Sequence, residues 1–336
     1  MKRPQIIPTS PRAALQCAHK SRRYLQVRPR AAPPDNPFFR RLPGRLAAIT
    51  CYFNPCGYTS LRDNYRRFAD GIRDRRVPLY TAELAFGERP FALDGEPNLS
   101  RFRARDVMWH KERLLNLLLP QVPAKFDKIA WIDADILLTD PDWPADAARL
   151  LEEFPVVQLF EEAVYLDRQG RPAEARTGVA RGVADGREDA CNFGRFHPGF
   201  AWAARRDLLK QHGLLDNNIS GGGDSIMVCA MFGWWRHPRI LRYGPPMQRA
   251  FAAWGQPFSR EVQGRVGYVP GRVLHLCHGQ PANRLYVERI DWLNHAQFSP
   301  EADLRSGLDG LWEWAGGSAR LREQMRQYFF DRRDDE

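Results

Sequence analysis

The chain has 336 residues, of which 43% are hydrophobic and 27% are charged, a composition ordinary for a globular protein with a sizeable core. No apolar stretch approaches the roughly 20 residues that a membrane span requires, and no signal-peptide pattern is present, so we expect a cytoplasmic protein without a transmembrane segment. The net charge of +10 comes entirely from residues 1–45, which hold 11 Lys or Arg and one acid. The neutral remainder argues against a body that binds nucleic acid.

The basic segment defines the expected domain organisation. Residues 1–44 are rich in Pro and Arg and lack periodicity, so we expect a poorly ordered leader. This leader is either a dispensable extension or a contact for an anionic polymer or a membrane surface. Residues 45–300 are predicted to form the main domain, and residues 301–336 a helical C-terminal extension.

Strands and helices alternate in the first half of the main domain. Continuous apolar runs predict buried strands, and apolar spacings of three and four residues predict amphipathic helices. The predicted strands cover 45–53, 77–86, 128–136 and 155–160, and the predicted helices cover 60–75, 105–119 and 145–154. This order indicates βαβ crossovers and a parallel sheet. The charged, Gly-rich stretch 161–196 has little periodicity and is predicted to be a mobile loop.

The second half contains three further signals and a long amphipathic tail. "HPGFAWAARRDLL" (197–209) predicts a strand that leads into a helix. "NNISGGGDSIMVCAMFG" (217–233) predicts a Gly-rich turn, an aspartate and an apolar helix. "GRVLHLCHG" (271–279) predicts a strand that ends in two histidines. From residue 283 to the end, the pattern predicts amphipathic helix.

The predicted strand "KIAWIDADI" (128–136) contains two aspartates, Asp133 and Asp135, directly after its apolar run. That run predicts a strand covered on both faces, as at the centre of an α/β sheet. Ligands of such sheets bind beyond the carboxyl ends of the strands. Carboxylates at i and i+2 point to the same side of an extended chain. The pair is therefore placed to bind a cation together with the ligand that the cation holds. The alternative is that Asp133 is an ordinary turn residue and Asp135 is a helix or turn cap.

These features, in this order, resemble the GT-A class of nucleotide-sugar-dependent glycosyltransferases over roughly residues 45–300. The half-Rossmann unit and the D-x-D pair come first. The "GGGD" element at 221–224 is similar to the W-G-G-E-D stretch of the β-1,4-galactosyltransferases. The late "HLCHG" is similar to the ending of uncharacterised bacterial and phage glycosyltransferase-like proteins. The chain departs from the galactosyltransferases because Ser225 follows Asp224 where they have a run of acids, and because it lacks paired cysteines. The resemblance implies an α/β fold whose mixed sheet is flanked by helices and continues into a helical C-terminus.

The resemblance also implies an activity. The enzyme would move a sugar from a nucleoside diphosphate sugar, with a UDP-sugar favoured, to a hydroxyl acceptor. That acceptor would be a glycan, a lipid-linked glycan, a small molecule or a modified nucleic acid. Mn²⁺ or Mg²⁺ would neutralise the charge that develops on the leaving diphosphate.

Four residues are expected at this metal. Asp135 would ligate the ion directly, and Asp133 would contact ribose or a metal-bound water. His275 and His278 are candidates for a third ligand because Mn²⁺ also accepts imidazole, with His278 favoured and His275 behind it. The alternative is that both histidines are structural.

Asp224 is predicted to be the general base that takes the proton of the acceptor hydroxyl. A base in this position suits single displacement with inversion. Gly222 and Gly223, which precede it, suggest that a substrate comes close to the backbone. The alternative is that Asp224 only caps the helix that follows.

Four further contacts to the nucleotide are predicted from position. Glu83 closes the second predicted strand and could meet ribose or base. Arg105 and Lys111 flank the start of the helix before D-x-D, where a cation can reach the base or the diphosphate. Gly279 lets the backbone approach a phosphate. The alternative for the three charged residues is a solvated helix or strand face.

Other enzymes use a D-x-D pair. A nucleotidyltransferase or a metal-dependent phosphohydrolase would carry a Gly-rich phosphate loop with a Lys after the first strand. The chain has "CYFNPCGYTS" (51–60) at that position, without the loop or the Lys. A glycosyltransferase that acts on modified DNA would combine sugar transfer with the basic leader.

Overall fold

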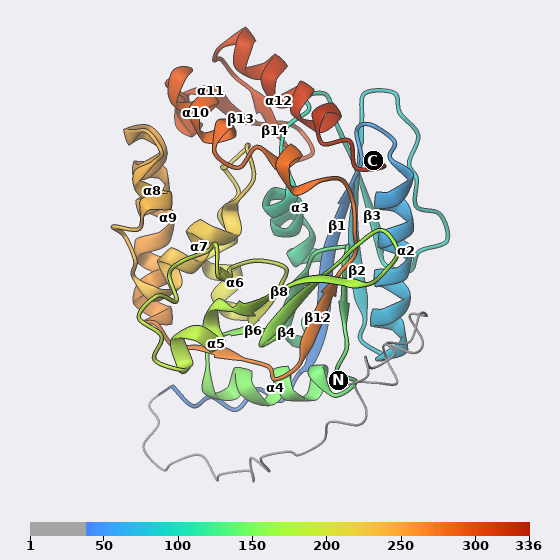
Figure 1. Ribbon diagram of the computed structural model, residues 1–336, viewed down its shortest axis with the longest axis vertical. Helices are drawn as coiled ribbons and strands as arrows, with labels where there is room; N and C mark the ends of the chain where they lie inside the picture. The colour runs from blue at the N-terminus through green and yellow to red at the C-terminus, as the bar shows by residue number, and fades with distance from the viewer. Residues whose placement is uncertain (1–37) are drawn as a thin grey trace, which may run out of the picture.

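The computed structural model describes residues 38–336 (Figure 1), so most of the expected leader, residues 1–37, lies outside the described residues. The strands are β1 (Arg45–Phe53), β2 (Leu79–Phe86), β3 (Leu99–Ala104), β4 (Phe126–Ile132), β5 (Ile136–Leu138), β6 (Val156–Gln158), β7 (Glu162–Leu166), β8 (Pro172–Gly178), β9 (Phe196–His197), β10 (Ala201–Arg205), β11 (Val266–Tyr268), β12 (Arg272–His275), β13 (Leu304–Ser306) and β14 (Trp312–Trp314).

The helices are α2 (Thr59–Asp74), α3 (Lys111–Leu118), α4 (Trp143–Glu153), α5 (Val179–Ala184), α6 (Arg206–His212), α7 (Gly223–Phe232), α8 (Pro238–Leu241), α9 (Pro245–Val262), α10 (Glu288–His295), α11 (Pro300–Asp303) and α12 (Ala319–Asp331). Within residues 38–336, no helix combines the length and the apolar character that a membrane crossing needs.

A seven-stranded sheet forms the centre of the molecule, in the order β11-β6-β10-β4-β1-β2-β3. β1 pairs in parallel with β2 and β4, and β2 pairs in parallel with β3. β10, from the second half of the chain, lies antiparallel between β4 and β6, so the sheet is mixed. The predicted α/β class, with a mixed sheet flanked by helices, is confirmed.

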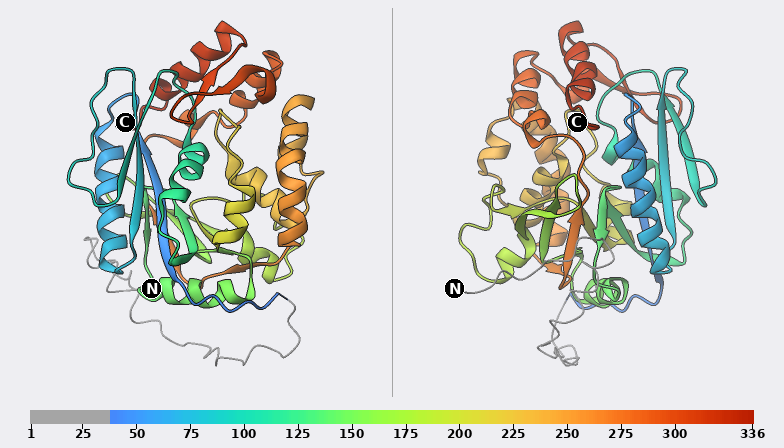
Figure 2. Two further views of the ribbon diagram at one scale, coloured as in Figure 1. Left: turned by 180° about the vertical axis from the view of Figure 1, so that it is seen from behind. Right: turned by 45° about the vertical axis from the view of Figure 1, so that its right-hand side comes forward.

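Helices cover both faces of this sheet, which explains the continuous apolar run of β4. Ile129 and Trp131 pack into one core with residues of α3, α6, α7 and α9. Ala130 and Ile132 pack into the opposite core with residues of α2 and α4. Figure 2 shows these two helical layers on either side of the strands. Because β4 ends at Ile132 and β5 begins at Ile136, the D-x-D residues form the turn between two strands.

A second, five-stranded sheet has the order β5-β12-β7-β8-β9. Its strands β7 and β8 lie within the stretch 161–196, and α5 follows them there, so the prediction of a mobile loop is wrong for these elements. The strand signal is hidden because β8 is largely exposed and polar and is held by backbone pairing with β7. Val273 and Ala163 bury this sheet against the core on the α2 and α4 side. The second sheet therefore brings β12 and its histidines beside the D-x-D turn.

The C-terminal segment lies over the carboxyl end of β1, where α10 and α12 are grouped (Figure 1). Phe53 at the end of β1 packs edge-to-face on Phe329 of α12, with ring centroids 6.1 Å apart. The prediction of helix from residue 283 onward misses the hairpin formed by β13 and β14. Trp312 and Trp314 are two residues apart and therefore share one face of β14. Trp314 is buried and Trp312 is half-buried. Residues 328–334 of this segment form one wall of a cavity beyond β1 and β4.

Candidate metal and substrate site

A cavity of about 900 Å³ opens beyond the carboxyl ends of β1 and β4, the position at which α/β sheets bind ligands. Its walls come from the D-x-D turn, the glycine turn before α7, the residues after β12 and the segment 328–334. Most of the charged residues predicted from the sequence line it, together with others that the sequence analysis did not single out. The predicted residues in the lining are Lys111, Asp133, Asp135, Gly222, Asp224, His275, His278 and Gly279.

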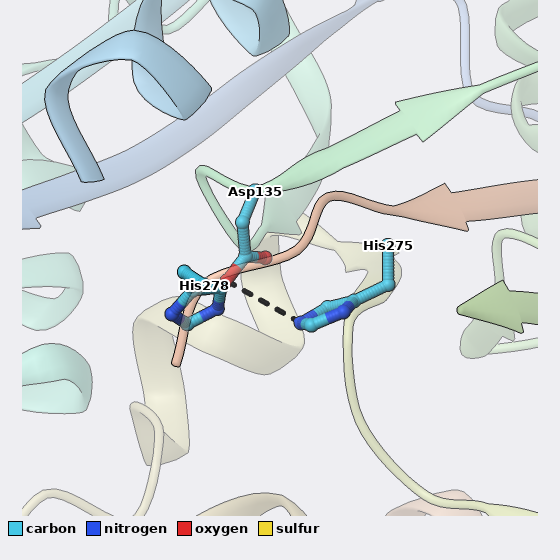
Figure 3. A group of neighbouring side chains, drawn as sticks. All are labelled: Asp135, His275 and His278. Carbon is cyan, nitrogen blue, oxygen red and sulfur yellow. Dashed lines mark ion pairs between the residues drawn. The ribbon is translucent and has the colours of Figure 1, made fainter. Parts of the chain in front are cut away.

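Asp135, His275 and His278 form a compact group of potential metal ligands. Their ligand atoms all lie within 4.8 Å of one another. The Nε2 atom of His278 is 2.7 Å from Oδ2 of Asp135, and the Nε2 atom of His275 is 3.7 Å from the same oxygen. Figure 3 shows the three side chains, from the D-x-D turn and from β12 and its extension, pointing toward one another. Both histidines, and not His278 alone, are therefore in reach of a common ion.

The chemistry of this group fits a divalent cation. Oδ1 of Asp135 is buried and has no hydrogen-bond partner within residues 38–336, and a buried acceptor without a partner is costly unless a ligand completes it. Burial raises the pKa of Asp135, but His275 and His278 outweigh it and hold this pKa below its usual range. Burial lowers the pKa of His275 to about 3, so its ring is neutral and able to ligate. One carboxylate with two imidazoles suits Mn²⁺ better than Mg²⁺, which prefers oxygen ligands alone.

A second charged group lies beside the first. The Nζ atom of Lys111, at the start of α3, is 2.6 Å from Oδ1 of Asp133 and 3.2 Å from Oδ2 of Asp224. Burial lowers the pKa of Lys111, but the carboxylates Asp133 and Asp224 outweigh it and raise this pKa well above its usual value. Burial, with the nearby charges of Asp224 and Asp135, raises the pKa of Asp133 to about 7 despite Lys111. Lys111 thus joins two carboxylates and does not stand free for a nucleotide.

An aromatic wall connects the two groups. Phe200 has a φ of 75°, a conformation that a bulky residue seldom adopts. This backbone lets its carbonyl accept a hydrogen bond of 2.8 Å from the Asp133 amide. The Phe200 ring stacks on His197 and on His275, with centroids 3.7 and 4.9 Å away. Because such stacking fixes ring orientation, the wall positions His275. The sequence analysis missed it, and the pattern of 196–200 offers no signal beyond its aromatic residues.

Asp334 supports the metal group from behind and was also missed. It is 2% exposed, and its Oδ1 atom lies 3.2 Å from Nδ1 of His278. Arg332 and Arg284 pair with the same carboxylate at 2.9 and 3.3 Å. Burial raises the pKa of Asp334, but these three partners lower it overall. No motif marks this residue, because it meets His278 only through the packing of the segment after α12.

The structure does not bring Glu83, Arg105 or Gly223 into the cavity lining. Glu83 is 1% exposed, and its Oε1 atom accepts hydrogen bonds from the backbone amides of Ala92 and Leu93. Arg105 lies on the surface beside Asp106, at 3.7 Å, because α3 begins six residues later than predicted. The nucleotide contacts predicted for Glu83 and Arg105 are therefore wrong.

The glycines of the site accommodate the protein's own side chains. A Cβ atom would lie 2.8 Å from Arg289 at Gly221, 2.8 Å from Arg239 at Gly222 and 2.8 Å from Glu112 at Gly223. At Gly279 it would lie 2.8 Å from the carbonyl oxygen of Arg332. Gly279 thus admits the 332–334 segment, and the phosphate approach predicted for it is replaced by this contact. No side chain caps α7, so the alternative role of Asp224 as a helix cap is not observed.

No protein-family model matches the chain, and no curated protein matches it. Among solved structures, the catalytic domain of Drosophila beta1,4-galactosyltransferase 7 in complex with xylobiose is similar, with 12% identity and a TM-score of 0.32 over 67% of this chain and 64% of that chain. The match thus spans less than two thirds of that domain. A glycosyltransferase involved in glycosylation of the major capsid of PBCV-1 matches at 11% identity and a TM-score of 0.26, over 74% and 98%. The galactosyltransferase LgtC matches at 13% and 0.29, over 74% and 95%. These distant likenesses leave the family of the chain open.

Proposed function

We propose that the protein is a metal-dependent glycosyltransferase of the GT-A type, which moves a sugar from a nucleoside diphosphate sugar to a hydroxyl acceptor. The observation that carries the proposal is the convergence of two groups in one large cavity beyond the parallel strands. One group, Asp135 with His275 and His278, is equipped to bind a divalent cation. The other, Lys111 with Asp133 and Asp224, supplies a carboxylate that can take a proton.

Asp135, His275 and His278 would hold Mn²⁺, which fits this mixed donor set. The ion would supply positive charge against the diphosphate that leaves as the glycosidic bond breaks. Around that position, the chain contributes the neutral ring of His275, held by Phe200, and the imidazole of His278, held by Asp334. The carboxylate of Asp133 is the next group along the turn, within reach of the sugar or ribose hydroxyls of a donor. A uridine diphosphate sugar is our choice of donor.

Asp224 is the proposed general base. A Cβ added at Gly199 would lie 3.1 Å from its Oδ2 atom, which places Asp224 against the aromatic wall that also contacts His275. Lys111 places a positive charge beside the Asp224 carboxylate, with its Nζ atom donating to both carboxylate oxygens. As the acceptor oxygen bonds to the anomeric carbon and the bond to the diphosphate oxygen breaks, Asp224 takes the hydroxyl proton. This arrangement supports a single displacement with inversion.

The test is calorimetric titration of UDP with and without Mn²⁺. We expect the wild-type protein to bind UDP more tightly when Mn²⁺ is present, and Asp135→Ala to lose that gain because the carboxylate ligand is gone. Asp142→Ala is the matched control, since Asp142 is exposed in the turn before α4 and caps nothing with its side chain. Equal metal-dependent affinity in wild type and Asp135→Ala would overturn the proposal.

A further inference from the structure

Two arginines in the wall of the cavity have no acidic partner. Arg239 lies on α8 and Arg289 on α10, and both line the cavity. Within residues 38–336, neither forms an ion pair with Asp or Glu. Arg284 and Arg332 in the same cavity are different, because both pair with Asp334. The charges of Arg239 and Arg289 are thus left without a counter-charge from this part of the chain.

Burial makes the unpaired charge of Arg289 costly and covers part of the Arg239 side chain. Arg289 is 3% exposed; among residues 38–336 its guanidinium donates to the carbonyl oxygens of Ser220 and Leu285 and lies over the ring of Tyr328, 4.5 Å from its centroid. Arg239 is half-buried; its Nη1 atom donates to the carbonyl oxygen of Tyr286, while its Nε atom is buried and has no hydrogen-bond partner in the part of the chain that the structure describes. A buried cation is destabilising unless an anion or strong acceptors compensate it. An anion bound in this part of the cavity would offset this destabilisation.

Both guanidiniums converge on the glycine turn directly before Asp224. A Cβ atom would lie 2.8 Å from Nη1 of Arg289 at Gly221 and 2.8 Å from Nη2 of Arg239 at Gly222. These glycines have φ angles of 77° and 81°, a left-handed region that glycine adopts without strain. The turn opens into α7, a ten-residue helix whose N-terminus carries no side-chain cap. Helix N-termini with free amides favour anions.

We propose that Arg239, Arg289 and the N-terminus of α7 bind a phosphate group carried by the hydroxyl acceptor. Two guanidiniums and a helix N-terminus match the charge of a phosphate monoester better than the single charge of a carboxylate. The acceptor is favoured over the donor because this turn leads directly into Asp224, the proposed base. The assignment to the acceptor rests on the proposed function, whereas the phosphate site rests on the arginines themselves.

The first experiment titrates inorganic phosphate into the full chain by calorimetry, in chelator and at low ionic strength. We expect Arg239→Gln to bind phosphate at least tenfold more weakly than wild type. Arg239→Lys keeps the charge and should retain part of the affinity. Arg242→Gln is the matched control, because Arg242 at the end of the same helix pairs with Asp291 outside the cavity. Wild-type affinity in Arg239→Gln would overturn the site, and equal affinity for acetate would overturn the choice of phosphate.

The second experiment repeats the titration with UDP and Mn²⁺ at saturating concentrations. If the arginines serve the acceptor, the phosphate affinity should change less than threefold. Loss of phosphate binding on addition of UDP would overturn the acceptor assignment, because the arginines would then hold the donor phosphates. Failure of UDP to bind at all would overturn the proposed function and with it the acceptor assignment. The Arg239-dependent binding of the first experiment is measured without UDP or metal and so separates the two failures.

Discussion

The two aspartates of the D-x-D turn lie two residues apart and yet belong to different halves of the cavity. Asp135 faces the imidazoles of His275 and His278. Asp133 faces Lys111 and, beyond it, Asp224. Burial disfavours the ionised form of both carboxyl groups, but the histidines reverse its effect on the pKa of Asp135. At Asp133, burial and the neighbouring carboxylates prevail over Lys111, and the pKa rises to about 7.

This difference divides the motif between two groups of side chains, one around Asp135 and one around Asp133. The partners of Asp135 come from the second sheet, and those of Asp133 come from α3 and α7, on the opposite side of the central sheet. The candidate metal group and the group that contains the proposed general base are thereby placed side by side without sharing a residue. The predictions below test that division, beginning with the largest effect.

Asp224→Asn should separate transfer from donor binding. The amide preserves the shape of the side chain but cannot take a proton, and general-base contributions amount to about 10²–10⁴-fold in rate. We expect kcat to fall by that factor while the Mn²⁺-dependent affinity for UDP stays within about twofold of wild type. Steady-state assays of donor consumption and UDP calorimetry measure the two quantities. Transfer at the wild-type rate would move the base elsewhere in the cavity.

Lys111→Met should destabilise the fold through the Asp133 half alone. The Lys111 side chain is 10% exposed, and removing one partner of a buried ion pair costs about 3 kcal/mol or more. The double variant Lys111→Met with Asp133→Asn removes both charges and should recover part of the loss. Urea unfolding of the wild type, both single variants and the double variant gives the coupling between the two residues. Additive effects would show that Asp133 and Lys111 do not form a coupled pair.

The two aspartates should contribute to stability with opposite dependence on pH in metal-free protein. The raised pKa of Asp133 means that its contribution is fully present below about pH 4, its unfolded range, and is lost as pH rises through about 7. The lowered pKa of Asp135 means that its contribution is present above about pH 4 and is lost in acid. Because Asp133 is 24% exposed, we expect about 2 kcal/mol from it.

Denaturant unfolding at pH 4 to 7.5 in chelator checks this prediction. Asp133→Asn should be more stable relative to wild type at pH 7.5 than at pH 4.5, whereas the difference between Asp135→Asn and wild type should stay level over this range, because the Asp135 contribution is lost only below about pH 4. Asp142→Asn, in the exposed turn, serves as the control with no trend. Parallel stability profiles for the two site variants would mean that the halves of the cavity are electrostatically alike.

The sequence predicted the part of the cavity around Asp135 better than the part around Asp133. The buried strand before Asp133 and Asp135 follows from its apolar run, and the histidine-bearing strand follows from its own pattern, so both could be placed at a ligand-binding edge. Their meeting depends on the second sheet, whose strands β7 and β8 have no alternating pattern because polar residues cover the exposed face of β8. Charge and exposure therefore concealed the element that brings β12 to the turn.

The errors have a common physical cause. Glu83 and Arg105 were chosen because they lie at the ends of predicted elements, but the register of β2 buries Glu83 under the amides of Ala92 and Leu93. Lys111 does line the cavity, and its nucleotide contact stays a prediction, but its two carboxylate partners come from separate elements and have no local signal. Asp334 could not be predicted, since its contact with His278 joins residues 56 positions apart. Long-range partners of charged groups follow from packing and are absent from local patterns.

His278 has two possible hydrogen-bonding states, and Asp334 distinguishes them. Nδ1 of His278 lies 2.8 Å from Nη2 of Arg284 and 3.2 Å from Oδ1 of Asp334. When Nδ1 accepts from Arg284, the proton lies on Nε2 and is donated to Asp135. When Nδ1 donates to Asp334, Nε2 is free to bind a metal. A carboxylate behind a ligating imidazole stabilises the second state.

Asp334→Asn should therefore weaken metal binding at least tenfold, about 1.4 kcal/mol, because the neutral amide is a poorer acceptor for the Nδ1 proton. The measurement is calorimetric titration of Mn²⁺ alone, so that it does not depend on donor or activity. Asp335→Asn is the matched control, since Asp335 accepts from the amides of Thr59 and Ser60 at the start of α2.

If both variants lose affinity equally, the 332–335 segment acts only by closing the fold over the site. If neither loses affinity, Arg284 alone orients His278. A loss confined to Asp334→Asn would mean that Asp334, which contacts neither Asp133 nor Asp135, sets the metal affinity through His278. The group around Asp133 differs, because there the charge of Lys111 contacts both Asp133 and Asp224 directly.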